Sequence, residues 1–185
     1  MMRALSATLV LVAALLTTDP TRAAPAADAF GFTFTAIEGG PLPLSEFRGR
    51  PVLVVNTASR CGYTYQYAGL VRLWNAYRER GLVVLGVPSG DFGQELGDNG
   101  KVKEFCEASF DVDFPLTEMT HVRGPEAHPL FVWLRETLGP RVGPSWNFAK
   151  FLIGPDGRAL KAWSSGTEPD GPEVRAAIEA VLPQS

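Results

Sequence analysis

Cys61 is the residue whose surroundings best suit redox chemistry. It follows a short aliphatic segment, Pro51–Val55, whose apolar character on both faces predicts a buried strand. Gly62 and Thr64 come next and predict a hinge and the N-cap of a helix. At such a junction the free N–H groups of the helix N-terminus favour an anion, and the thiolate is the nucleophilic form of cysteine. The alternative is an inert cysteine buried in a turn.

The second cysteine, Cys106, falls on a predicted short helix over residues 101–109. Val102 and Phe105 share its apolar face, so on its own Cys106 is interpreted as a core residue. Two further roles stay open beside an activated Cys61. The two cysteines can pair in a structural disulfide, as is common in exported proteins. Cys106 can also be a resolving thiol that attacks an oxidised Cys61 and expels water.

Trp146 and Asn147 are candidate hydrogen-bond donors near the start of a predicted strand over residues 145–153. An indole N–H and a side-chain amide can both donate to a thiolate or to a developing oxyanion. The alternative is a core tryptophan beside a turn asparagine. The chain has no Cys-x-x-Cys motif, which disfavours a general disulfide oxidoreductase. Its two histidines, His121 and His128, have no further ligand at metal-binding spacing, so no metal is predicted.

The order of the predicted elements is that of an α/β domain with a thioredoxin-like fold. An N-terminal β-hairpin precedes a strand–helix–strand unit, which predicts two parallel strands. A second hairpin and a final helix follow, so we expect a central mixed sheet flanked by helices. The polar loop after the second central strand is expected to face Cys61, because cleft residues lie at the carboxyl ends of strands. The expected elements are a hairpin over 30–44, strands over 51–55, 82–88, 145–153 and 158–163, helices over 64–80 and 101–109, a helix from Pro125 or Pro129 to Gly139, and a last helix capped by Asp170.

Residues 1–26 have the layout of a secretory signal peptide, with Arg3 before an apolar run over 4–16 and small residues near Ala26. The mature domain is therefore expected over residues 27–185, in a periplasm or secreted. No second apolar stretch is long enough to span a bilayer, so no stable membrane insertion is expected. A formal net charge of −3 without basic runs argues against nucleic-acid binding.

The chain resembles the glutathione peroxidases, in their cysteine form, over about residues 30–182. The most specific matching motifs are Asn56-Thr-Ala-Ser-Arg-Cys61-Gly-Tyr-Thr64 and Trp146-Asn-Phe-Ala-Lys-Phe-Leu-Ile153. Shorter matches are Phe92-Gly93, Lys103-Glu-Phe-Cys106 and His128-Pro-Leu130.

The resemblance implies a role for each candidate residue. Cys61 takes the place of the peroxidatic residue, Trp146 and Asn147 those of its hydrogen-bonding partners, and Cys106 that of the resolving cysteine in thioredoxin-dependent members. The implied activity is reduction of hydrogen peroxide and of organic or lipid hydroperoxides without a bound cofactor. A thioredoxin-like protein or glutathione would be the external thiol reductant. The short connection before Trp146 resembles the compact, monomeric branch of the family.

One departure from the family pattern concerns the loop after the second central strand. The family has a glutamine there that completes the group activating the thiol, and here Asp91 stands in its place. A carboxylate near Cys61 would oppose the thiolate, so Gln94 becomes the candidate for the glutamine's role. The departure leaves an alternative open: a non-catalytic redox-sensing or binding module with a structural Cys61–Cys106 disulfide.

Overall fold

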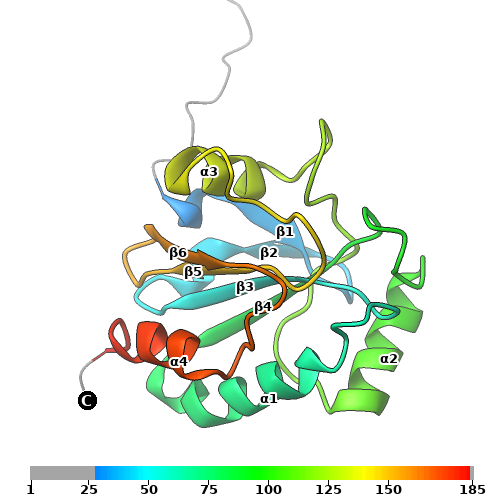
Figure 1. Ribbon diagram of the computed structural model, residues 1–185, viewed down its shortest axis with the longest axis horizontal. Coiled ribbons are helices and arrows are strands. Elements are labelled where there is room, and N and C mark those ends of the chain that lie inside the picture. The colour runs from blue at the N-terminus through cyan, green and yellow to red at the C-terminus, as the bar shows by residue number, and fades with distance from the viewer. Residues whose placement is uncertain (1–27, 184–185) are drawn as a thin grey trace, which may run out of the picture.

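β3 (Val52–Thr57) is the central strand of the sheet, and all six of its residues are buried. In the computed structural model, which describes residues 28–183, the strand order is β4-β3-β5-β6 (Figure 1). β4 (Val83–Pro88) runs parallel to β3, whereas β5 (Lys150–Ile153) runs antiparallel to it. β6 (Ala159–Trp163) pairs antiparallel with β5. The predicted mixed sheet is therefore confirmed.

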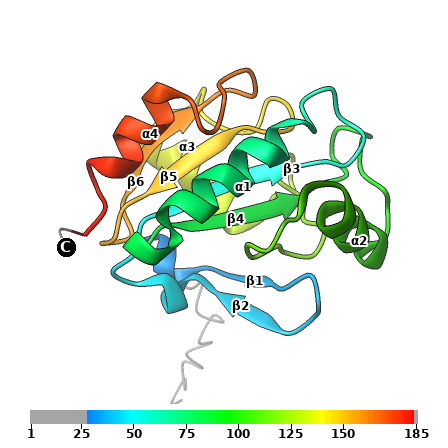
Figure 2. The same cartoon turned by 90° about the horizontal axis from the view of Figure 1, so that it is seen from below.

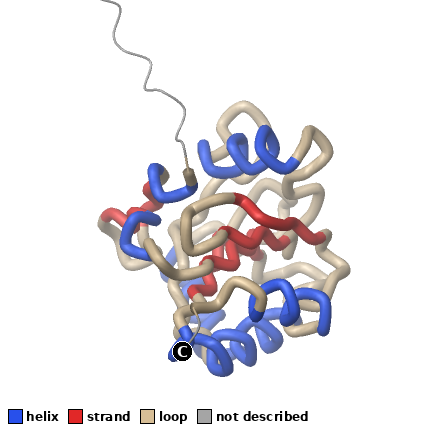
Figure 3. The backbone as a smooth tube through the Cα atoms, turned by 90° about the vertical axis from the view of Figure 1, so that its left-hand side faces the viewer, coloured by secondary structure: helices blue, strands red, loops and turns tan. Residues whose placement is uncertain are grey.

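Helices cover both faces of this sheet. α1 (Gln66–Tyr77) and α4 (Pro172–Glu179) lie on one face, and α3 (Pro129–Leu138) lies on the other (Figures 1 and 3). The hairpin of β1 (Thr33–Thr35) and β2 (Pro41–Pro43) packs on the α3 side, while α2 (Asn99–Phe110) stands beyond the carboxyl end of β4 (Figure 2). Together with the parallel unit β3–α1–β4, this layering is the predicted thioredoxin-like fold.

The alternation of side chains along β3 divides the core into two apolar clusters. Val52 and Val54 pack toward α3 and the hairpin, and Leu53 and Val55 pack toward α1 and α4. Partners on the first side include Phe34, Leu44, Leu130, Phe131 and Leu134, and partners on the second include Leu70, Leu73, Val174 and Ile178. A strand that is buried on both faces explains why its sequence is aliphatic without alternation.

The helix bounds differ from the predicted ones at several ends. α1 begins at Gln66, two residues after Thr64, and its N-cap position is Tyr65, which makes no side-chain capping bond. A 3₁₀ turn over 78–80 continues α1, and Gly81 closes it with φ 102°, as its left-handed cap position predicts. α3 begins at Pro129, where the Nδ1 atom of His128 accepts the N–H of Leu130 at 3.2 Å.

Two predictions about the last third of the chain are wrong. Residues 145–149 do not belong to a strand: the ladder of β5 starts only at Lys150, and Phe148 has φ 64°, which interrupts extended backbone. Asp170 does not cap α4, since Gly171 holds the N-cap position and the Asp170 carboxylate lies 2.6 Å from Nε of Arg72.

Two expectations concern the rest of the chain and the membrane. The predicted signal peptide, residues 1–26, lies outside the described residues and stays a prediction. Over residues 28–183, no helix is both long and apolar enough to cross a bilayer.

Lys150 is a fully buried lysine beneath the start of α1. Its ammonium donates to the side-chain oxygen of Gln66 and to the carbonyls of Ser165 and Thr167. These neutral acceptors tie β5 to α1 and to the loop that leads into α4. Burial lowers the pKa of Lys150 to about 8.

We expect Lys150→Met to lower the free energy of unfolding by about 2 kcal/mol at pH 7, because buried acceptors lose their donor. The difference from wild type should widen from pH ~8 to ~10.4, since the unfolded chain there binds a proton at Lys150 that the folded chain has released. Urea unfolding at several pH values measures both effects. A difference that is constant with pH would contradict the lowered pKa.

Candidate active site

Cys61 lies in a tight turn between β3 and α1 and is 7% exposed. Its N–H donates to Oγ1 of Thr64 at 3.0 Å, and its Sγ accepts the N–H of Tyr63 at 3.4 Å. Thr64 thus folds back onto the Cys61 turn and does not cap α1, which corrects the predicted role of this residue. The turn thus presents one main-chain donor, the N–H of Tyr63, to the sulfur.

The loop after β4 is bonded directly to the Cys61 turn. The N–H of Arg60 donates to the carbonyl of Gln94 at 2.9 Å, and the N–H of Ser59 donates to Oε1 of Glu95 at 3.0 Å. The expectation that this loop faces Cys61 is therefore met. Glu95 is the residue that sequence reasoning passed over: it joins the two segments, and burial raises its pKa, opposed by the bonds from Ser59 and Leu96.

Gln94 and Asn147 are in direct contact. Nδ2 of Asn147, a fully buried residue, donates to Oε1 of Gln94 at 2.9 Å, and Oδ1 of Asn147 has no partner among the described residues. The Trp146 ring is 41% exposed and its centroid lies 5.3 Å from that of Phe92. Three of the predicted site residues, Gln94, Trp146 and Asn147, therefore meet beside the turn that carries Cys61.

Asn56, near the end of β3, holds the segment before β5 in place. Its Nδ2 donates to the carbonyl of Trp146 at 3.1 Å, and its Oδ1 accepts the N–H of Ala149 at 3.0 Å. Its main-chain carbonyl accepts the N–H of Phe148 at 2.6 Å. Asn56 appeared in the sequence analysis only within a motif, and no local pattern signals this bridging role.

The Asp91 carboxylate is bonded to the segment of residues 121–123. One carboxylate oxygen lies 2.6 Å from Nδ1 of His121, and the other accepts the N–H groups of Val122 and Arg123 at 2.7 and 3.1 Å. Burial opposes ionisation of this carboxyl, but these hydrogen bonds outweigh it and hold the pKa of Asp91 below its usual value. The carboxylate that departs from the family pattern is thus engaged by another segment.

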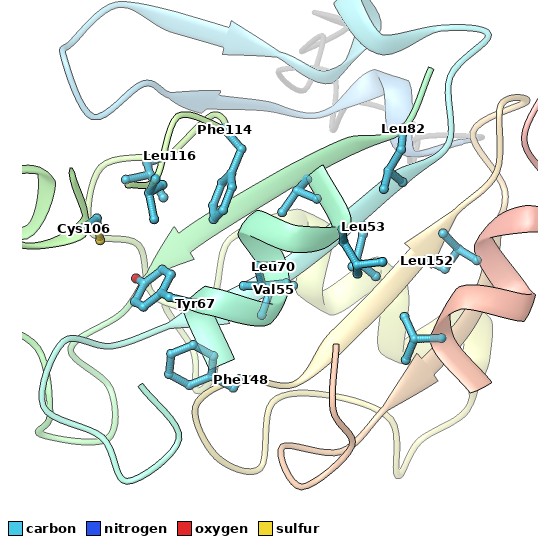
Figure 4. Close-up of a cluster of buried hydrophobic side chains, with 14 of the residues drawn as sticks. Leu53, Val55, Tyr67, Leu70, Leu82, Cys106, Phe114, Leu116, Phe148 and Leu152 are labelled. Atoms are coloured by element: carbon cyan, nitrogen blue, oxygen red, sulfur yellow. The ribbon is translucent and has the colours of Figure 1, made fainter. Parts of the chain in front are cut away.

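Cys106 lies apart from this group, on α2, and is completely buried. Figure 4 shows the hydroxyl of Tyr67 directed toward it. Burial raises the pKa of the Cys106 thiol to about 11. Cys61 and Cys106 are both free thiols, so the structural disulfide of the alternative interpretation is not present. Within residues 28–183, no three metal-ligating side chains are placed to hold an ion.

The fold defines the chain as a thioredoxin-like α/β protein. The family described as glutathione peroxidase matches residues 29–135. The chain is 44% identical to the hydroperoxy fatty acid reductase gpx1 of Synechocystis sp., covering 83% of this chain and 95% of that one. It is 39% identical to the glutathione peroxidase-like peroxiredoxin GPX5 of Chlamydomonas reinhardtii, covering 82% and 96%. The crystal structure of Trgpx in apo form is similar, with 35% identity, a TM-score of 0.68, and coverage of 84% and 96%. The chain belongs to the glutathione peroxidase family.

We expect Asn56→Ala to lower the free energy of unfolding by about 2–4 kcal/mol, because two main-chain groups lose their partner in a buried position. The loop of Trp146 should also loosen, which hydrogen exchange at residues 146–149 would detect. Asn75→Ala, at an exposed position of α1, is the matched control and should change stability by less than about 0.5 kcal/mol. Equal effects of the two substitutions would refute the bridging role of Asn56.

Proposed function

We propose that this protein is an exported, monomeric thiol peroxidase in which Cys61 reduces hydrogen peroxide and organic or lipid hydroperoxides. The observation that carries the proposal is the pair formed by Gln94 and Asn147, held beside the Cys61 turn by the bond from Arg60 to Gln94. We infer that these two side-chain amides and the neighbouring indole of Trp146 are the groups that a peroxide meets as it approaches the sulfur.

The first step of the proposed reaction is attack of the Cys61 thiolate on one peroxide oxygen. The sulfur–oxygen bond forms, the oxygen–oxygen bond breaks, and the leaving oxygen takes a proton to become water or an alcohol. Cys61 becomes a sulfenic acid. The amide of Gln94 and the indole N–H of Trp146 are the donors suited to stabilise the charge on the leaving oxygen.

The second step joins the two cysteines. The Cys106 thiol attacks the sulfenic sulfur, a disulfide forms, and the hydroxyl leaves as water with the thiol proton. Because Cys106 is buried and mostly protonated at neutral pH, it must leave its pocket before it can react. Two residues of α2, Val102 and Cys106, are completely buried, and Phe105 and Phe110 pack against the same core, so the proposed step requires these contacts to open locally.

Substrate and reductant are assigned by chemistry and by similarity. The relatives include a hydroperoxy fatty acid reductase, and the aromatic rings of Tyr65 and Trp146, 53% and 41% exposed, offer apolar surface to an organic hydroperoxide. The resulting disulfide needs two electrons from an external thiol, for which a thioredoxin-like protein or glutathione is suited. No bound cofactor takes part in the proposed cycle.

Stoichiometric peroxide should remove two hydrogens from the reduced mature protein and link Cys61 to Cys106, as read by intact mass and peptide mapping. Cys61→Ser should lower the rate of peroxide consumption by at least about a thousandfold, because a serine hydroxyl is a poor nucleophile at neutral pH. Cys106→Ser should gain one oxygen at Cys61 and stop. Full activity of Cys61→Ser would refute the proposal, and an unreactive wild type would favour the non-catalytic module.

Gln94→Ala should slow the reaction of Cys61 with hydrogen peroxide by about 10–100-fold, because one donor is lost from the site. Gln94→Glu, which is similar in size, should be slower still, since it places a carboxylate there. Stopped-flow measurement of a single turnover separates this step from later reduction. If both variants react at the wild-type rate, Gln94 has no role in the reaction of Cys61 with peroxide.

A further inference from the structure

Asp91 and His121 are in contact, and neither residue takes part in the steps of the proposed reaction. The Asp91 side chain is only 9% exposed, and its oxygens meet Nδ1 of His121 and two main-chain N–H groups at 2.6–3.1 Å. Nε2 of His121 lies 3.7 Å from a carboxylate oxygen of Glu126. His121 therefore bridges the loop after β4 and the segment before α3.

Asp91 belongs to the same short loop as the proposed site residues. The next residue, Phe92, packs on Trp146, and the guanidinium of Arg123 lies 5.1 Å from the Phe92 ring on the segment that holds Asp91. Gln94, three residues after Asp91, contacts Asn147. Asp91 is therefore linked, through the backbone of one short loop, to the residues proposed to act at Cys61.

We propose that His121 is a positioning residue for the reaction at Cys61: it holds the Asp91 carboxylate against the segment of residues 121–123 and away from the sulfur. The inference rests on the proposed function, because it concerns how fast Cys61 reacts with peroxide. When His121 is absent, the carboxylate keeps only its two main-chain donors, and its uncompensated charge disfavours a second anion nearby.

The effect should depend on pH through His121. The hydrogen bond to Asp91 raises the pKa of His121, so the charge compensation is complete below the ordinary histidine value and is lost as pH rises through the raised one. The ionisable groups around the ring are Asp91 and Glu95 on the loop after β4, Glu118 and Arg123 on its own segment, and Glu126 and His128 before α3.

The test is a double-mutant cycle of His121→Ala and Asp91→Asn, with the reaction of reduced protein with hydrogen peroxide followed by rapid quench and intact mass. In the wild-type background, His121→Ala should slow the reaction about tenfold at pH 7. The midpoint of the increase in reaction rate with pH should shift to a value about one pH unit higher. The difference in rate between wild type and His121→Ala should become smaller toward pH 9, where His121 is neutral and no longer compensates Asp91. In the Asp91→Asn background the same substitution should cost less than about twofold, because no charge remains to be held.

Glu173→Gln serves as the matched control, since it breaks the exposed ion pair with Lys161 that joins β6 to α4 and should leave the rate unchanged. Equal losses in both backgrounds, no loss at all, or a loss without a shifted pH profile would each overturn the inference. A wild-type protein that does not react with peroxide would instead refute the proposed function. If the wild type reacts and His121→Ala reacts at the same rate, only the inference about His121 is refuted.

Discussion

The arrangement of the site depends on the hydrogen bonds made by the side chain of Asn56. Residues 146–149 precede the ladder of β5, so the sheet itself does not fix them. Asn56 supplies the missing hydrogen bonds with one amide, which donates to Trp146 and accepts from Ala149. Through this side chain, β3 fixes residues that its backbone pairing does not reach. The position of Asn147, and of Gln94 which it contacts, follows from these bonds.

A buried polar network of the same kind supports the opposite end of the site. Lys150 ties the first residue of α1, Gln66, to the loop before α4. The rings of Phe148 and Tyr67 pack edge to face, with centroids 5.4 Å apart. Asn56 and Lys150 thus hold the two segments that frame the Cys61 turn, one through neutral amide bonds and one through an ammonium.

Much of the fold could be predicted because apolar periodicity decides it. The aliphatic runs of β3 and β4 and the apolar faces of α1 and α3 gave the right elements and pairing. Thr64 was misassigned because its hydroxyl bonds locally to the Cys61 turn and so does not cap the helix. Asp170 and residues 145–149 were misassigned because long-range contacts, to Arg72 and to Asn56, override the local preference. The motifs named Trp146 and Asn147, and the departure at Asp91 pointed to Gln94 as a substitute donor. The partner of Asp91 is His121, which is 30 residues away in the chain. No local pattern encodes that partner.

The burial of Cys106 has a kinetic consequence if this cysteine is the resolving thiol, as we propose. If the resolving thiol reaches Cys61 only when α2 opens, then the lifetime of the sulfenic acid equals the waiting time for a piece of the fold to unfold and not the time for a bond to form. A sulfenic acid that waits in excess peroxide can proceed irreversibly to a sulfinic acid. In that case the contacts that hold α2 on the core would set the peroxide concentration above which the protein is irreversibly oxidised.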